Sequence, residues 1–168
     1  MIMAYADRFI ATDNLIIHLK TAIGTITDPA IQANYAGFLS VSSVTVYELA
    51  IKDIFFEFAS KKNKVFGAFV EKRFRQLNGR IKISDLKGEH IKPFGDKYLK
   101  KFENILQAKE SHFFSTLKIS IPTDYGNLIT CRHKYVHGGY PTLTMNEVIN
   151  CYNSGKEILH CLDDSMKR

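Results

Sequence analysis

The stretch Cys131-Arg132-His133-Lys134-Tyr135-Val136-His137-Gly138-Gly139 ends a predicted helix and gives the clearest indication of the fold. Apolar residues recur through this helix at helical spacing: Leu128, Ile129, Cys131, Tyr135 and Val136. We expect Thr123 to cap its start, and the two glycines with Pro141 to end it. An extended connection over 118–122 is expected before it, because a residue that precedes proline disfavours the helical conformation.

Helical signals continue on both sides of this stretch. Thr144 and Glu147 have the spacing of a capping box, and a last helix follows them. On the other side, Asp28-Pro29 supplies an N-cap followed by a proline in the first turn. Further helices are predicted over 3–22, 29–60 and 65–77, a short one capped by Ser84 or Asp85, and one capped by Asp96. The sequence therefore predicts an all-α bundle of about six or seven helices.

The 65–77 helix is expected to be amphipathic. Its buried side is predicted to carry Phe66, Phe69, Val70, Phe74 and Leu77, and Asn78-Gly79 is expected to end it. A chain of 168 residues is typical of one domain, so we expect a single helical domain over 1–168.

Composition excludes several classes of protein. Hydrophobic residues make up 45% and charged residues 24%, which is globular composition and excludes wholesale disorder. No apolar run approaches the ~18 residues of a transmembrane helix, and the N-terminus does not resemble a signal peptide. Three widely spaced cysteines without a CxxC pattern favour a reducing compartment over a disulfide framework. We therefore expect a cytoplasmic protein with no membrane contact.

Positive charge is concentrated in the middle of the chain. Residues 61–101 contain 13 Lys or Arg and four Asp or Glu, whereas the remaining residues contain 10 basic and 13 acidic side chains. A local excess of this kind attracts polyanions and speeds their association. It is also compatible with ordinary solvated helix faces, and it does not discriminate between RNA, DNA and an acidic protein surface.

Four side chains near the helix end are basic or become basic on protonation: Arg132, His133, Lys134 and His137. Cations are favourable at a helix C-terminus, which accounts for the arginine and the lysine but less well for two histidines. Histidine transfers protons near neutral pH, and arginine binds phosphate bidentately. An arginine and a histidine beside a phosphate are sufficient for RNA cleavage without a metal, with the ribose 2′-hydroxyl as nucleophile.

Helix geometry complicates this interpretation. On an ideal helix, positions 133 and 137 are about 40° apart, whereas positions 132 and 137 are about 140° apart. One helix therefore does not bring Arg132 and His137 together, unless it loosens near Gly138 or a second copy of the chain completes the site.

The stretch 132–138 resembles the R-x4-H signature of HEPN domains, which often has asparagine where this chain has His133. The wider chain, from about residue 35 to the end, resembles the RiboL-PSP-HEPN type. A long early helix is followed by a basic middle, the R-x4-H helix, a turn and one closing helix. The resemblance implies an all-α bundle, often a homodimer in which two R-x4-H helices form one composite site. It also implies metal-independent endoribonuclease activity that leaves a 2′,3′-cyclic phosphate, with no cofactor.

By this resemblance, Arg132 and His137 are the catalytic pair, with His133 beside them. Lys134 and Tyr140 are candidate substrate contacts, although Tyr140 is also compatible with a turn residue packed on the bundle. Glu48 is the candidate for an acidic group that some family members supply from an earlier helix; a solvated glutamate is the alternative. The implied partners are RNA, a second copy of the chain and, for a toxin or phage-defence effector, a cognate antitoxin or other protein.

Two alternatives remain at the level of sequence. His133 and His137 have a spacing that suits two zinc ligands, with Cys131 and His112 as conceivable others, but the cation of Lys134 opposes a metal there. The second alternative is a catalytically inactive module that binds RNA or a protein partner. The basic middle of the chain and the missing motif asparagine favour it.

Overall fold

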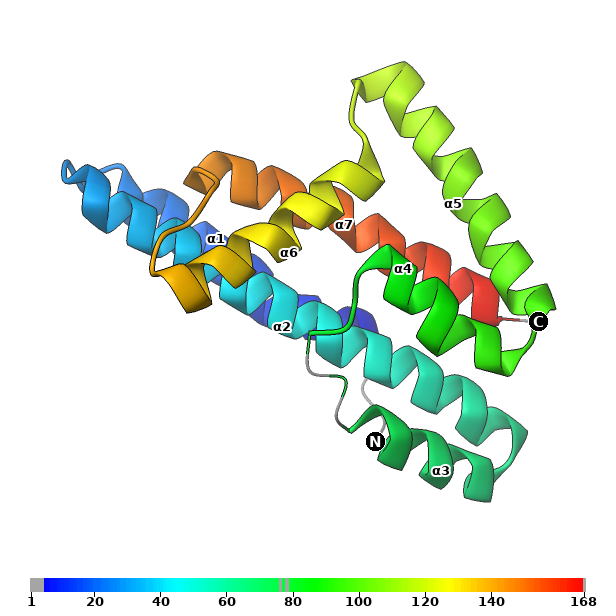
Figure 1. Cartoon of the computed structure of the whole chain (residues 1–168). Helices are drawn as coiled ribbons and strands as arrows, with labels where there is room; N and C mark the ends of the chain where they lie inside the picture. The colour runs from blue at the N-terminus through cyan, green and yellow to red at the C-terminus, as the bar shows by residue number, and fades with distance from the viewer. Residues whose placement is uncertain (1–4, 76, 78, 168) are drawn as a thin grey trace.

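The computed structural model describes residues 5–75, 77 and 79–167, and within them every regular element is a helix (Figure 1). The all-α prediction is confirmed. The elements are η1 (Tyr5–Arg8), α1 (Phe9–Ile23), α2 (Pro29–Lys62), α3 (Lys64–Phe74), α4 (Ile83–Asp85), η2 (Leu86–Ile91), η3 (Lys92–Phe94), α5 (Asp96–Leu117), α6 (Ile121–Gly138) and α7 (Met145–Met166). None of the helices it describes has the length and hydropathy needed to cross a membrane.

Helix α2 is the central element of the bundle and contacts α1, α3, α6 and α7 (Figure 1). It begins as predicted: Asp28 accepts a hydrogen bond from the Ala30 N–H at 2.8 Å, and Pro29 occupies the first turn. Its 34 residues bury apolar and small side chains on several faces, because neighbours pack around it on more than one side. It therefore serves as the support for both α6 and α7.

Three tyrosines join α2, α6 and α7 in the core. The Tyr47 ring stacks between Tyr125 and Tyr152, with centroids 5.6 and 5.8 Å away. The Tyr47 hydroxyl donates to the Tyr152 carbonyl, and the Tyr125 hydroxyl donates at 2.7 Å to the carbonyl of Ile81. These bonds satisfy hydroxyls that burial would otherwise leave unpaired. The Tyr125 bond also fastens the connection between α3 and α4 to α6.

Two predictions about α3 are wrong. The helix ends at Phe74, earlier than 77, and the Leu77 N–H instead bonds the Phe74 carbonyl at 3.2 Å. Phe69 is 60% exposed, although it was expected on the buried side. The buried row follows the i+4 spacing of Phe66, Val70 and Phe74, and Phe69 lies outside it. Asn78, expected to end the helix, lies outside the described residues.

Three predicted caps also differ from the structure. The short helix begins at Ile83, because Asp85 accepts from the Lys82 N–H at 3.1 Å and so occupies the third helical position. Helix α5 includes Asp96 and has Gly95 as its N-cap. Helix α6 starts at Ile121, since Pro122 is tolerated in a first turn. Its N-cap is therefore Ser120, and Thr123 lies inside the helix, so the extended connection is shorter than 118–122.

The junction between α2 and α6 depends on a glycine. A Cβ atom at Gly37 would lie 2.2 Å from the Tyr135 ring, whereas a Cβ at Gly126, on the exposed side of α6, would meet nothing within 4 Å. We expect Gly37→Ala to destabilise the fold by about 1–3 kcal/mol through overpacking. Gly126→Ala, the matched control, is expected to stabilise it by about 0.5–1 kcal/mol. Urea unfolding measures both, and equal changes would contradict this packing.

Candidate active site

The helix that carries the basic stretch stays regular to its end. Helix α6 runs through Gly138, and the Gly139 N–H bonds the Tyr135 carbonyl at 2.9 Å. Gly139 has a φ of 73°, the left-handed conformation that glycine adopts readily and that ends a helix. Since α6 does not loosen before Gly138, the helical directions of Arg132 and His137 remain about 140° apart.

His133 and His137 lie together on the exposed side of α6. Their ring centroids are 4.6 Å apart with an interplanar angle of 51°, and both side chains are open to solvent. This pairing is the one that the spacing of positions 133 and 137 predicts. The two imidazoles thus form a solvent-exposed pair next to the helix C-terminus.

Arg132 extends toward Gly79 in the α3–α4 connection, of which the structure describes residues 75, 77 and 79–82. A Cβ atom at Gly79 would lie 4.0 Å from Arg132 Nη1 and 3.9 Å from Glu48 Oε1, so both charged groups border the same glycine. Gly79 has a φ of 79°, which a residue with a side chain rarely adopts. Glu48, the candidate acidic group, thus lies on the other side of the same glycine, and the assignment of a role to it remains a prediction.

The polar atoms at this place are incompletely satisfied. Among the atoms that the structure describes, Glu48 Oε1 and Arg132 Nε are buried and have no hydrogen-bond partner. A buried polar atom without a partner costs free energy, so its retention calls for an explanation such as a ligand or a catalytic role. The charge of Glu48 also contributes, after burial, to raising the pKa of Tyr125. Arg132 Nε is therefore not committed to a structural hydrogen bond.

The other predicted contacts lie around the histidines. Lys134 is exposed, one residue after His133. The Tyr140 ring packs on the backbone of Gly138 and is still about half exposed. Val136 was expected among the apolar members of the helix but is also about half exposed, because it faces away from α2 and α7. The exposed side of the α6 end is thus a mixture of basic and apolar groups.

The histidine pair does not extend into a metal-binding group. Cys131 is fully buried, and His112 is exposed on α5. Across the described residues, no three His, Cys, Asp or Glu side chains come together with the geometry of a metal site.

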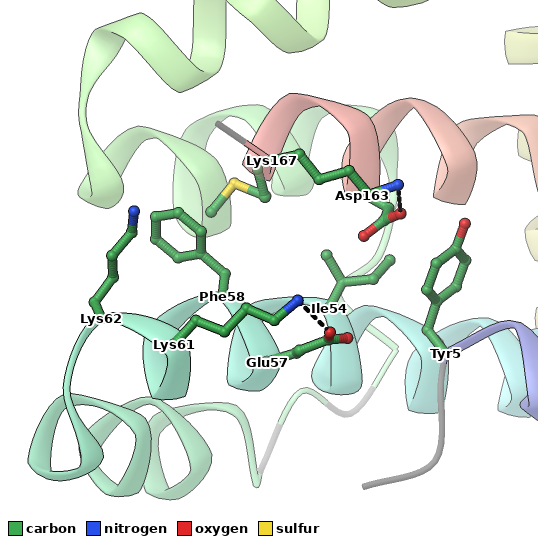
Figure 2. Close-up of a pocket in the computed structure, with 9 residues that line it drawn as sticks. Tyr5, Ile54, Glu57, Phe58, Lys61, Lys62, Asp163 and Lys167 are labelled. Carbon is green, nitrogen blue, oxygen red and sulfur yellow. Dashed lines mark ion pairs between the residues drawn. The ribbon is translucent and has the colours of Figure 1, made fainter.

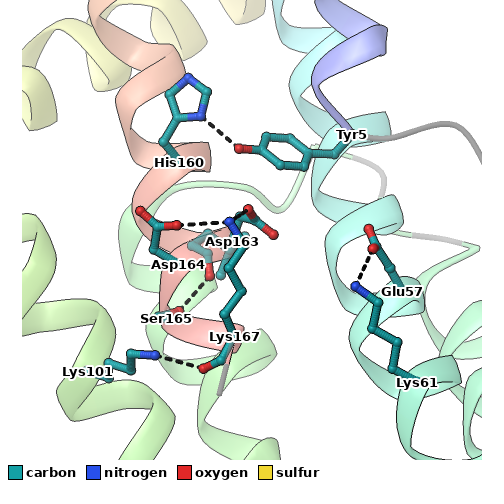
Figure 3. Close-up of polar contacts among 10 residues, drawn as sticks. Tyr5, Glu57, Lys61, Lys101, His160, Asp163, Asp164, Ser165 and Lys167 are labelled. Atoms are coloured by element: carbon teal, nitrogen blue, oxygen red, sulfur yellow. Dashed lines mark hydrogen bonds and ion pairs between the residues drawn. The ribbon is translucent and has the colours of Figure 1, made fainter.

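A pocket of about 560 Å³ lies elsewhere, between the C-terminal ends of α2 and α7 (Figure 2). Its charged groups are largely paired with one another. Lys61 contacts Glu57 at 2.6 Å, and Lys167 contacts both Asp163 and Asp164, the latter at 3.0 Å (Figures 2 and 3). Among the described lining residues, Lys62, whose ammonium lies over the Phe58 ring, is the one cation outside these pairs, so we assign this pocket no part in the site.

The same region fixes Tyr5 and Lys167, the first and last residues that the structure describes. The Lys101 ammonium donates to the Lys167 carbonyl at 2.7 Å, and the Tyr5 hydroxyl lies 2.7 Å from His160 Nδ1 (Figure 3). Burial, with the nearby charge of Asp163, raises the pKa of Tyr5 to about 12. Tyr5 therefore stays protonated and available for this bond at physiological pH.

Fold and site together define an all-α domain with a basic arginine–histidine motif at the end of its penultimate long helix. The chain belongs to the RiboL-PSP-HEPN family, whose model matches residues 7–168, so the resemblance found in the sequence is confirmed. Comparison with curated proteins and with solved structures found no match.

The proximity of the α3–α4 connection to Arg132 is not predictable from the sequence. The Asn78-Gly79 sequence predicts only the end of a helix, and no local signal connects Gly79 with Arg132 or Glu48. The signal in the sequence is the concentration of basic residues on both sides of Gly79, including Arg75 and Arg80.

Proposed function

We propose that this protein is a metal-independent endoribonuclease of the HEPN type. The observation that carries the proposal is Arg132, whose buried Nε has no hydrogen-bond partner among the described residues, near the end of a helix that also presents the His133–His137 pair. Membership of the RiboL-PSP-HEPN family supports a role connected with RNA. The net charge of +6 suits a polyanionic substrate.

The reaction uses groups that this chain supplies. The ribose 2′-oxygen attacks the neighbouring phosphorus while an imidazole, that of His137, takes the 2′-hydroxyl proton. The bond from phosphorus to the 5′-oxygen breaks, and a protonated imidazole gives that oxygen a proton. The products are a 2′,3′-cyclic phosphate and a 5′-hydroxyl end. Arg132 offsets the charge that develops on the phosphoryl oxygens, and His133 is close enough to His137 to serve as the second proton carrier.

The site is proposed to be completed across a homodimer. Within one chain, Arg132 points to Gly79 and Glu48, whereas the histidines occupy the exposed side of α6. A two-fold axis beside the α6 end would place the arginine of one copy near the histidines of the other. Phe38 and Val136, each about half exposed near this end, would supply apolar area for the contact.

Lys134, exposed beside the histidines, and Tyr140 are proposed to contact the RNA on either side of the reacting phosphate. Glu48 is proposed to hold the guanidinium of Arg132 in place from α2. The catalytically inactive RNA-binding module remains the second candidate, and the basic excess over residues 61–101 favours it. A role as a toxin or phage-defence effector with a cognate antitoxin is a further proposal that depends on the activity.

The test is cleavage of bulk cellular RNA by the purified protein in EDTA. We expect fragments with 2′,3′-cyclic phosphate ends. The cleavage rate should be the same with and without EDTA, because no proposed group needs a metal. Activity that disappears in EDTA and returns with a divalent cation would contradict the metal-independent mechanism. RNA binding with strong salt dependence but no cleavage would favour the inactive module.

A further inference from the structure

A pair of arginines, distinct from the motif residues, lies where α3 meets the α3–α4 connection. Arg73 on α3 and Arg80 on the connection line a small pocket of about 170 Å³, together with Phe74, Leu77, Glu89 and His90. His90 is only 8% exposed, and its Nε2 is 2.7 Å from the Arg80 carbonyl, which fixes this part of the connection. The pocket is thus a small concave site with two guanidinium groups and an ordered histidine on its wall.

These arginines are only weakly engaged by the protein. Arg80 Nη1 lies 3.5 Å from Glu89 Oε2, and the two side chains are 73% and 50% exposed. An ion pair that is long and exposed contributes little to stability. Arg73 donates to the Glu89 backbone carbonyl at 3.2 Å and retains further N–H donors in its guanidinium. Both guanidinium groups therefore have the capacity to bind an anion bidentately.

The pocket is connected directly to the motif. Gly79 precedes Arg80 and borders Arg132 Nη1, so the same short segment touches the motif arginine and carries a pocket arginine. The segment is held from both sides, by the Tyr125 hydroxyl on the Ile81 carbonyl and by His90 on the Arg80 carbonyl. An RNA strand whose phosphate reaches Arg132 would therefore pass close to a fixed, positively charged pocket.

We propose that the Arg73–Arg80 pocket binds a backbone phosphate of the RNA whose reacting phosphate lies at Arg132. The inference rests on the proposed function and deepens it, since the pocket would make the protein favour RNA long enough to reach both places. A guanidinium pair with no base-reading partner recognises phosphate and not sequence. The pocket therefore contributes affinity and substrate length, while any base preference arises elsewhere.

The carboxylate of Glu89 makes the pocket testable by two opposite changes of charge. Its carboxylate shares the pocket with the two arginines and competes with an incoming phosphate for Arg80. Removal of its charge should tighten RNA binding, whereas removal of the arginine charges should weaken it. A purely structural role for the Arg80–Glu89 pair would make both changes act in the same direction.

The experiment measures binding of a mixed-sequence single-stranded RNA to full-length protein that carries His137→Ala, so that the RNA stays intact. We expect Arg73→Gln with Arg80→Gln to weaken binding by roughly tenfold or more, because charge-assisted hydrogen bonds are lost. The slope of log Kd against log salt should fall by about 0.7 for the one phosphate contact. Arg73→Lys with Arg80→Lys should restore part of the affinity, and Glu89→Gln should increase it.

The matched control removes two positive charges elsewhere, with Lys20→Gln and Lys118→Gln, two exposed residues at the ends of α1 and α5. An equal loss of affinity in this control, or unchanged binding in the arginine variant, would overturn the pocket assignment. Weaker binding by Glu89→Gln would overturn it too. Native protein that neither binds nor cleaves RNA would instead overturn the proposed function, and the pocket with it.

Discussion

His137→Ala is expected to lower the rate of RNA cleavage by about 10²–10⁴-fold, the range that loss of general acid–base catalysis produces. The imidazole is exposed next to the helix C-terminus, 4.6 Å from the ring of His133, and no described contact buries it in the core. The variant should therefore fold normally and bind RNA as the native protein does. Single-turnover cleavage, read together with thermal unfolding, separates lost chemistry from lost structure.

The matched control for this variant is His18→Ala, which removes an exposed histidine from α1. We expect it to cleave RNA at the native rate. His133→Ala should cause a smaller loss than His137→Ala, because it leaves in place His137, the imidazole that is proposed to take the proton of the attacking 2′-hydroxyl. Native activity in His137→Ala would exclude this residue from the chemistry and leave the motif as a feature of binding or stability.

The starts of two long helices could be predicted from sequence, because the residues that form each cap lie close together in the chain. Asp28 and Pro29 at the start of α2, and Thr144 and Glu147 at the start of α7, form the caps that their spacing predicts. The region 83–94 was less predictable, because it combines α, π and 3₁₀ turns. Its conformation depends on distant contacts such as that of His90 with Arg80, and no periodic pattern encodes these.

The candidate site likewise has one feature that the sequence predicts and another that it does not. The pairing of His133 with His137 follows from helical spacing alone, and the structure contains it. The position of Gly79 beside both Glu48 and Arg132 joins residues far apart in the chain, so only the assembled bundle reveals it. For the same reason, the sequence indicated a basic middle segment but not that its α3–α4 connection lies against the motif.

Subunits that carry Arg132→Ala and subunits that carry His137→Ala, each inactive alone, should recover much of the cleavage activity when they form mixed dimers. Helix α6 stays regular to Gly138, so one chain directs its arginine and its histidine about 140° apart. A composite site in a mixed dimer retains one intact arginine from one copy and one intact histidine from the other. Co-expression with two affinity tags isolates the mixed dimer, and its cleavage rate is compared with both parents.

The control for this recovery is a mixed dimer of His137→Ala with the double variant Arg132→Ala/His137→Ala, which contains no histidine at position 137 and should stay inactive. Thermal unfolding checks that Arg132→Ala, which removes a partly buried guanidinium that borders the same glycine as Glu48, still folds. A purified mixed dimer without activity would place both groups of the site within one chain. A monomer by light scattering at concentrations where the native protein cleaves RNA would contradict the composite site altogether, and the arginine would then have to reach the histidines around its own helix.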